Sequence, residues 1–191
     1  MTKRTIGIYG GSFNPIHNGH TQLGLALCQK GLVDELWFVV SPHNPHKQQH
    51  DLLADEARLA LARIAVEETH CLRVSDVEFS LPRPSYMVNT LETLRNQYPH
   101  CEFVLVIGAD NWERFTLWYR HEEILRRHRL IIYPRPGYEL QDIPPGVTVA
   151  DTPLIPISST QIRDSIHQGD YNGEGLHPSV WKEINIKGYY R

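Results

Sequence analysis

The sequence predicts an α/β fold in which a parallel sheet carries helices on both faces. Three observations support this prediction. Short apolar runs alternate with stretches of helical periodicity along the whole chain. The apolar run at residues 103–107 is uninterrupted, as in a strand buried on both faces. No internal repeat or linker breaks the alternation. We therefore expect residues 1–191 to form a single, Rossmann-like, doubly wound domain.

Composition narrows the function classes. The chain has 191 residues, 41% of them hydrophobic and 21% charged, which is ordinary for a globular protein that buries its own core. A formal net charge of −3 gives no sequence-wide reason to expect a nucleic-acid or membrane partner. No run approaches the roughly 20 apolar residues of a membrane-spanning helix. Cys28, Cys71 and Cys101 are widely spaced in apolar segments, so we expect reduced packing residues of a cytoplasmic protein.

Each strand is predicted from an apolar run that ends at a glycine, a proline or a polar loop. The expected strands are Thr5–Tyr9, Glu35–Val40, Leu72–Val77, Phe103–Ile107, Leu130–Tyr133 and Val147–Ala150. Helices are predicted where apolar residues recur at helical spacing, around 23–27, 53–64, 87–98, 121–128, Ser159–Gln168 and Ser179–Asn185. Ser85 is expected to cap the helix that starts near Met87. In such sheets ligands bind beyond the carboxyl ends of the strands, so the loops there are the candidates for chemistry.

The first such loop reads GGSFNPIHNGH at residues 10–20. Gly10 and Gly11 would let the backbone turn sharply and approach a ligand. His17 and His20 flank an expected helix N-terminus, where free amides favour phosphate, and their rings can donate hydrogen bonds to phosphoryl oxygens. A metal-binding histidine pair and two ordinary loop histidines are the alternatives. The glycines are not followed by the Gly-Lys-Ser/Thr of a Walker loop.

The second segment reads ISSTQIR at residues 157–163. Its Ser and Thr residues form a helix N-cap whose hydroxyls and amides can also hold phosphate. Arg163 follows Ser159 by four residues, so it shares a helix face with that serine and leans back toward an anion bound at the N-terminus. Taken alone, this segment is better explained as a capped surface helix with a solvated arginine.

Together the two segments resemble the HxGH and ISSTxIR signatures of the nucleotidyltransferase superfamily. Over nearly its whole length the chain is most similar to the bacterial nicotinate-nucleotide adenylyltransferases. Residues 10–15 resemble the family's GGTFDP opening, and residues 45–47 its PPHK loop with a single proline. Ser85 and Tyr86 match its SYT motif, but Met87 replaces the threonine. Residues 108–110, 118–119 and 135–137 match its GxD, WY and RPG motifs.

The resemblance implies that the phosphate of nicotinate mononucleotide attacks the α-phosphorus of ATP, giving deamido-NAD and pyrophosphate in NAD biosynthesis. It implies catalytic roles for His17, His20 and Arg163. The implied ATP-binding residues are Gly10, Gly11, Ser12, Phe13, His17, His20, Gly108, Asp110, Ser158, Thr160 and Arg163. The implied acceptor-binding residues are Lys47, Ser85, Tyr86, Met87, Trp118, Tyr119 and Arg135. Mg²⁺ is expected to bind mainly through ATP phosphates, without a dedicated protein site. ATP and nicotinate mononucleotide are the implied partners, and a homo-oligomer stays open.

Alternatives remain for single residues. Asp110 would bind ribose hydroxyls or be a solvated loop aspartate. Trp118 would stack on the pyridine ring, with amides such as that of Tyr119 on the carboxylate, or it would belong to the core. The core alternative rests on a predicted core-facing stripe at helical spacing, made of Trp112, Phe115 and Tyr119. Lys47 and Arg135 would bind the phosphate of the mononucleotide or the triphosphate, or Lys47 would be a solvated loop lysine.

Two other functions also stay open. One is an adenylyltransferase that uses nicotinamide mononucleotide, alone or beside the acid; Met87 bears on this choice, because the hydroxyl of the family's threonine is missing. The other is a non-catalytic nucleotide sensor, against which the intact His17, His20 and Arg163 argue.

Overall fold

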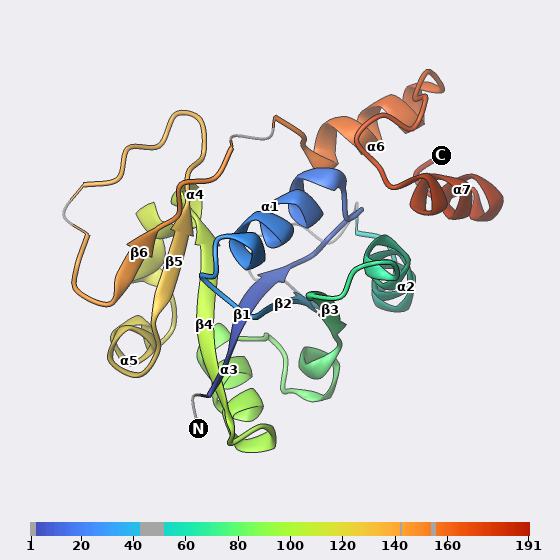
Figure 1. The fold of residues 1–191 in the computed structure, drawn as a ribbon. Coiled ribbons are helices and arrows are strands. Elements are labelled where there is room, and N and C mark those ends of the chain that lie inside the picture. Colours follow the sequence, from blue (N-terminus) through green and yellow to red (C-terminus); the bar gives the residue numbers. More distant parts are fainter. Residues whose placement is uncertain (1–2, 43–51, 142, 154–155) are drawn as a thin grey trace.

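The computed structural model describes residues 3–42, 52–141, 143–153 and 156–191. Six parallel strands form one sheet in the order β3-β2-β1-β4-β5-β6 (Figure 1). Their bounds are β1 Arg4–Gly11, β2 Glu35–Val40, β3 Leu72–Ser75, β4 Cys101–Gly108, β5 Leu130–Tyr133 and β6 Val147–Val149. The chain runs outward from β1 to β3, crosses back and continues outward from β4, so the order reverses between β1 and β4. The predicted doubly wound fold is confirmed.

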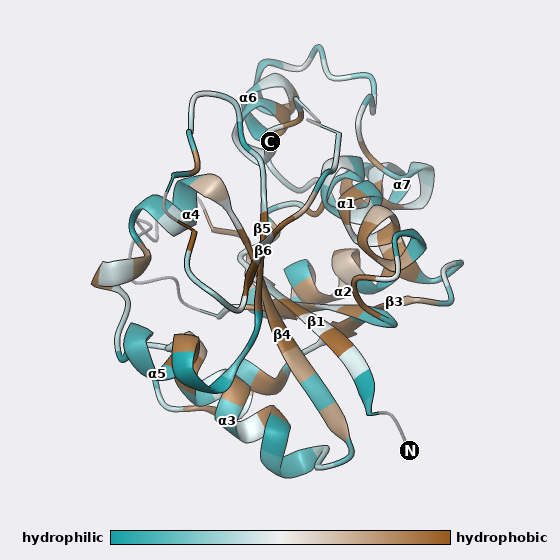
Figure 2. Ribbon diagram, turned by 60° about the vertical axis from the view of Figure 1, so that its left-hand side comes forward, coloured by the Kyte–Doolittle hydropathy of each residue, from teal (hydrophilic) through white to brown (hydrophobic). Residues whose placement is uncertain are grey.

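Helices cover both faces of the sheet. The α-helices are α1 Asn18–Gln29, α2 Asp55–Val66, α3 Met87–Gln97, α4 Ala109–Glu113, α5 His121–Arg127, α6 Ser159–Gln168 and α7 Pro178–Lys187, with 3₁₀ helices η2 Val77–Ser80 and η3 Phe115–Leu117. One core cluster joins the sheet to α1, α2, α6 and α7, and a second joins it to α3 and α5. Figure 2 shows the central strands mainly in the hydrophobic colour and the helices with teal, hydrophilic positions. Among the described residues, no helix has the length and apolar character that a membrane crossing requires.

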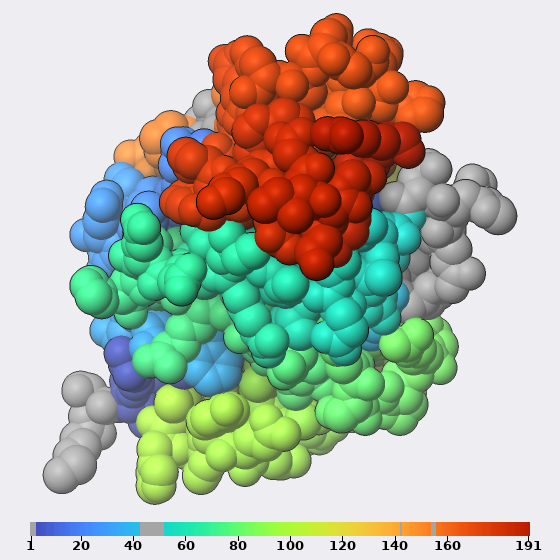
Figure 3. Space-filling model, turned by 90° about the vertical axis from the view of Figure 1, so that its right-hand side faces the viewer, coloured from blue at the N-terminus to red at the C-terminus, as the bar shows by residue number. Residues whose placement is uncertain are grey.

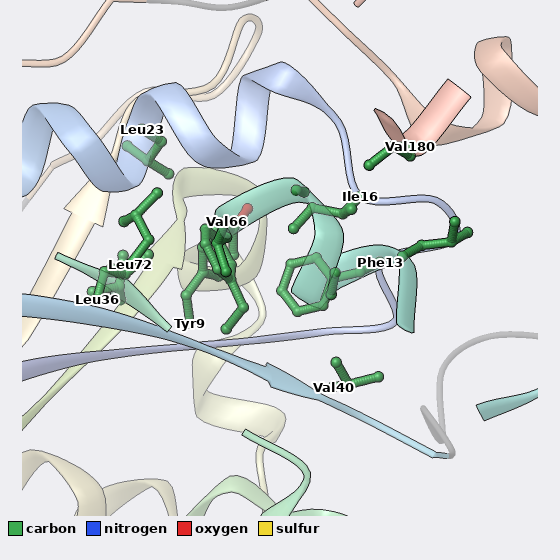
Figure 4. Packing of buried hydrophobic residues seen from close by; sticks show 14 of the residues in the cluster. Tyr9, Phe13, Ile16, Leu23, Leu36, Val40, Val66, Leu72 and Val180 are labelled. Atoms are coloured by element: carbon green, nitrogen blue, oxygen red, sulfur yellow. The ribbon is translucent and has the colours of Figure 1, made fainter. Parts of the chain in front are cut away.

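Alternation along the strands divides the side chains between the two clusters. On β1, Ile6 and Ile8 pack toward α3, whereas Tyr9 packs toward α1 and α2. Tyr9 shares its cluster with Phe13 and Ile16, which follow the strand (Figure 4). The β1–α1 loop is therefore anchored at Phe13 and Ile16, whose side chains pack in the core.

Two of the expected elements are wrong in detail. The strand expected at Leu72–Val77 ends at Ser75, because Val77 starts η2 and its backbone N–H bonds to Ser75 Oγ at 3.3 Å. Ser85 is not the cap of α3: Tyr86 is the N-cap residue and makes no side-chain cap bond.

The aromatic stripe expected for residues 112–119 is also partly wrong. Phe115 is buried and stacks with Trp112 at 5.3 Å, but Tyr119 is 54% exposed. The reason is a break in the helix, since α4 ends at Glu113 and a 3₁₀ turn follows. The α-helical period of 3.6 residues therefore does not extend to Tyr119.

Candidate active site

His17 and His20 lie at the N-terminus of α1, as expected. His17 is the N-cap residue, and its backbone N–H donates to Nδ1 of His20 at 3.2 Å. The two rings stack with centroids 3.7 Å apart. Because Nδ1 of His20 accepts this bond, a neutral His20 carries its proton on Nε2. The loop thus presents a ring N–H beside the positive end of a helix.

The turn of this loop is made at a different residue from the one expected. Gly10 and Gly11 lie inside β1, in register with Val39 and Val40 of β2. The chain turns instead at Phe13, whose φ of 44° lies in the left-handed region. A Cβ on Gly11 would lie 3.0 Å from the Phe13 ring, so the glycine makes room for that buried ring. The expected sharp turn at the two glycines is therefore wrong.

Burial and a nearby cation set the protonation of His17. Its side chain is almost fully buried, and burial together with the positive charge of Arg135 lowers its pKa to about 4. His17 is therefore neutral at pH 7 in the free protein.

This pKa predicts a stability change on acidification. The unfolded chain protonates His17 below about pH 6.5, whereas the folded chain resists until about pH 4, so stability falls as the pH falls through that window. We expect wild type to lose about 2 kcal/mol more than His17→Asn between pH 7 and pH 4.5. Urea unfolding at both pH values measures this. Equal losses in the two proteins would contradict the low pKa.

Arg135 and Asp110 lie beside the histidines. Arg135 follows β5, and its Nη2 donates to the Tyr133 hydroxyl at 3.0 Å, while its Nε lies 3.6 Å from Oδ1 of Asp110 at the start of α4. The Tyr133 hydroxyl also bonds to that of Tyr9 at 2.8 Å. A small pocket is lined by His17, His20, Tyr9, Tyr133 and Arg135 together. Both charged groups thus lie at the carboxyl ends of β4 and β5, next to the point where the strand order reverses.

The second segment meets the first. Ser158 is the N-cap residue of α6, as the Ser and Thr cluster predicts, although its side chain makes no cap bond. The Ser159 hydroxyl donates to the Pro15 carbonyl at 3.0 Å, and Nη1 of Arg163 donates to the Asn14 carbonyl at 2.8 Å. Nη2 of Arg163 lies 3.4 Å from the Thr160 hydroxyl, which agrees with the expected lean toward the helix N-terminus. The two motifs form one site although about 140 residues separate them along the chain.

Three of the acceptor candidates, Ser85, Tyr86 and Met87, lie at the start of α3. Tyr86 contacts Tyr119 with ring centroids 4.7 Å apart. A Cβ on Gly10 would lie 2.5 Å from Cε of Met87, so the start of α3 adjoins the end of β1. Trp118 is half-buried and packs against Phe115 at 5.4 Å, which leaves its stacking role a prediction. Lys47 lies outside the described residues.

Sequence reasoning missed Glu78, a carboxyl buried beside these residues. It is 2% exposed, and its Oε1 accepts a bond from the Thr90 hydroxyl at 2.7 Å. Burial raises the pKa of Glu78, against the opposing effect of the hydrogen bond from Thr90. Glu78 of η2 is thus joined to Thr90 of α3. No local pattern announces this contact, because the two residues lie in different elements.

Removing this carboxyl should weaken the fold and loosen the acceptor side. We expect Glu78→Leu to lower the free energy of unfolding by about 2 kcal/mol, since it leaves the buried Thr90 hydroxyl without its carboxylate acceptor. The matched Glu78→Gln variant keeps an acceptor oxygen and should lose less than about 1 kcal/mol. Urea unfolding compares them, and equal stability of all three proteins would contradict this role of Glu78.

Comparisons with known proteins agree with this geometry. The family described as cytidylyltransferase-like matches residues 8–165. A relative from Bacteroides fragilis, named nicotinate-nucleotide adenylyltransferase, is 48% identical over 96% of this chain and 92% of its own. One of the same name from Flavobacterium johnsoniae is 40% identical over 97% and 98% of the two chains.

Solved structures share the fold. The Plasmodium falciparum nicotinic acid mononucleotide adenylyltransferase complexed with NaAD superposes with a TM-score of 0.82 at 19% identity, over 98% of this chain and 97% of its own. The chain therefore belongs to the cytidylyltransferase-like nucleotidyltransferases and, within them, to the nicotinate-nucleotide adenylyltransferases.

Proposed function

We propose that His17, His20 and Arg163 carry out the reaction of this family, the transfer of the adenylyl group of ATP to nicotinate mononucleotide. The products are deamido-NAD and pyrophosphate, in NAD biosynthesis. One observation carries the proposal: Arg163 of α6 donates to the Asn14 carbonyl, which places its guanidinium on the loop that leads to the two histidines. Two anion-binding helix N-termini, those of α1 and α6, thereby serve a single triphosphate.

The chemistry asks for positioning and charge stabilisation. A phosphate oxygen of the mononucleotide forms a bond to the α-phosphorus of ATP, and the bond to the bridging oxygen breaks, so that pyrophosphate leaves with the electron pair. No nucleophile of the chain is required. The Nε2–H of His20 donates to the phosphoryl oxygens as negative charge grows on them. Ser158, Thr160 and Arg163 hold the β- and γ-phosphates.

Of the two expectations for Arg135, we propose the triphosphate. Arg135 lines the same pocket as His17 and His20. Nε of Arg135 lies 3.6 Å from Oδ1 of Asp110 and holds this carboxylate in place. The carboxylate would then accept hydrogen bonds from the ribose hydroxyls of ATP. Gly108 leaves room for the side chains of Asp110 and Tyr133, because a Cβ there would contact Asp110 and lie 3.0 Å from Tyr133.

We place nicotinate mononucleotide between the start of α3 and residues 118–119. The ring of Trp118 would stack on the pyridine, and the backbone amides of Met87 and Tyr119 would bind its carboxylate. The amide proposal for Met87 fits the substitution, because a backbone N–H is available whatever the side chain. The contact between Tyr86 and Tyr119 supports this placement by joining the two segments. Ser85 and Lys47 complete the proposed acceptor set.

Mg²⁺ would accompany ATP, bound mainly through phosphate oxygens and water, and would neutralise charge on the leaving pyrophosphate. Among the described residues, no group of three or more His, Cys, Asp or Glu side chains is arranged to hold a metal ion. We also propose a single domain over residues 1–191 that acts in the cytoplasm, supported by three free cysteines.

Pyrophosphate release tests the proposal. We expect release that requires ATP, Mg²⁺ and nicotinate mononucleotide together, with deamido-NAD formed in equal amount. Release with ATP alone would indicate hydrolysis and contradict transfer. Binding of ATP without release in the presence of either mononucleotide would favour a nucleotide sensor.

A further inference from the structure

The penultimate residue of the chain reaches into the loop of the active site. The Tyr190 hydroxyl donates to Oδ1 of Asn14 at 2.9 Å, across 176 positions of sequence. Tyr190 has a φ of 63°, in the left-handed region that is unfavourable for a residue with a large side chain. The side chain of Tyr190 is half-buried, with its hydroxyl on the first loop.

Asn14 connects three parts of the molecule. Its carbonyl accepts the bond from Arg163, and its side-chain Oδ1 accepts bonds from Tyr190 and from the backbone N–H of Leu53, the latter at 3.2 Å. Arg163 comes from α6, Tyr190 follows α7, and Leu53 precedes α2. The orientation of the Asn14 side chain therefore affects the position of the Asn14 carbonyl, which accepts the bond from Arg163.

Arg58 of α2 also binds the backbone of the β1–α1 loop. Its side chain is completely buried and donates to the carbonyls of Ser12 at 2.5 Å, Ser41 at 3.0 Å and Leu53 at 2.8 Å. The charge is balanced by Asp55, 2.5 Å away. Arg58 thus fixes the backbone on one side of Asn14, and Tyr190 fixes its side chain on the other.

The Tyr190 hydroxyl is held in its donor form. Burial raises the pKa of Tyr190, while the positive charges of Arg163 and Arg58 oppose that rise. A tyrosine hydroxyl is protonated at neutral pH with or without this shift, and its O–H donates a hydrogen bond to Oδ1 of Asn14. Packing of the ring alone would not need this oxygen, since a buried hydroxyl costs free energy unless it has a partner.

The C-terminal segment is anchored where this contact needs it. Val180 of α7 packs in the same cluster as Ile16 and Phe13 (Figure 4). In the space-filling view, the red C-terminal residues cover the α2 region in cyan and green (Figure 3). The last helix therefore delivers Tyr190 to the β1–α1 loop.

We propose that Tyr190 is a positioning residue for adenylyl transfer: its hydroxyl orients Asn14, whose carbonyl in turn holds Arg163 toward the triphosphate. This inference rests on the proposed function, because it assigns Arg163 to the phosphates. The juxtaposition of Tyr190, Asn14 and Arg163 carries it.

Tyr190→Phe is the test, because it removes the hydroxyl and keeps the ring. We expect kcat for pyrophosphate release to fall about 10-fold, the effect of one lost orienting hydrogen bond, with KM for nicotinate mononucleotide changed less than about 2-fold. Tyr189→Phe is the matched control at the neighbouring tyrosine and should leave both constants unchanged. All rates are measured well below the unfolding temperature of each variant, so that loss of fold does not enter.

A double-mutant cycle separates positioning from stability. In an Arg163→Ala background, Tyr190→Phe should slow the reaction less than about 2-fold, because the residue through which it acts is gone. Equal effects of Tyr190→Phe in both backgrounds, or a Tyr190→Phe enzyme as fast as wild type, would overturn the inference. If Tyr190→Phe does not fold, Asn14→Ala interrupts the same contact from the other side and should show the same dependence on Arg163. Wild type without pyrophosphate release would instead contradict the proposed function itself.

Discussion

Replacing His20 with alanine should lower kcat for pyrophosphate release about 100-fold or more, with a smaller effect on ATP affinity. His20 Nδ1 is engaged by the backbone N–H of His17, so Nε2–H is the donor that this ring offers to the phosphates. A donor aimed at growing charge contributes mainly in the transition state, and a loss of this size corresponds to about 2.7 kcal/mol. Single-turnover rates and ATP binding measure the two effects separately.

Two controls separate catalysis from folding. His20→Gln places a side-chain acceptor at the third helical position, where it can cap the His17 amide again, but it lacks the imidazole. We expect it to regain stability and to stay slow. His100→Ala makes the same alanine change at an exposed histidine before β4, at the opposite end of the strands, and should turn over normally. A His20→Ala enzyme at the wild-type rate would remove His20 from the mechanism.

The second large effect that we expect is a preference of the enzyme for nicotinate mononucleotide over nicotinamide mononucleotide as the acceptor. If the amides of Met87 and Tyr119 bind the nicotinate carboxylate, the carboxamide of nicotinamide mononucleotide offers one acceptor and places N–H groups against a donor. The unmatched polar groups then cost free energy, so we expect kcat/KM for the acid to exceed that for the amide about 100-fold or more.

Met87 gives this prediction a direct control. Met87→Thr restores the hydroxyl usual in the family, and it leaves the backbone amide in place. If the amide does the binding, the ratio of acid to amide should change less than about 3-fold. A large rise in that ratio on Met87→Thr would show that the side-chain hydroxyl, and not the amide, recognises the carboxylate.

Local patterns were sufficient for most of the fold. The bounds Glu35–Val40, Leu130–Tyr133 and Ser159–Gln168 agree with the structure, because short apolar runs and capping serines are local signals. Where the chain broke a regular period the prediction was wrong, as at the 3₁₀ turn that turns Tyr119 outward. Helical spacing applies only within α4, which ends at Glu113, six residues before Tyr119.

The histidine and arginine motifs were predictable from sequence, but the residues that hold them were not. Arg58 looks like a surface position of an amphipathic helix, yet it is completely buried and donates to three carbonyls, one from the β1–α1 loop and two from the β2–α2 loop. Tyr190 likewise acts through a partner 176 positions away, and Glu78 through Thr90 of another helix. Such contacts leave no period and no motif, and only the folded chain reveals them.

The most direct test of the account is pyrophosphate release with ATP and Mg²⁺, comparing nicotinate mononucleotide with nicotinamide mononucleotide as acceptor. We predict rapid release with the acid. At the same concentration, the rate with the amide should be lower by about 100-fold or more. Comparable rates would contradict a site that reads the carboxylate, although transfer itself would stand. No release with either acceptor would contradict the central claim that this site transfers an adenylyl group to a pyridine mononucleotide.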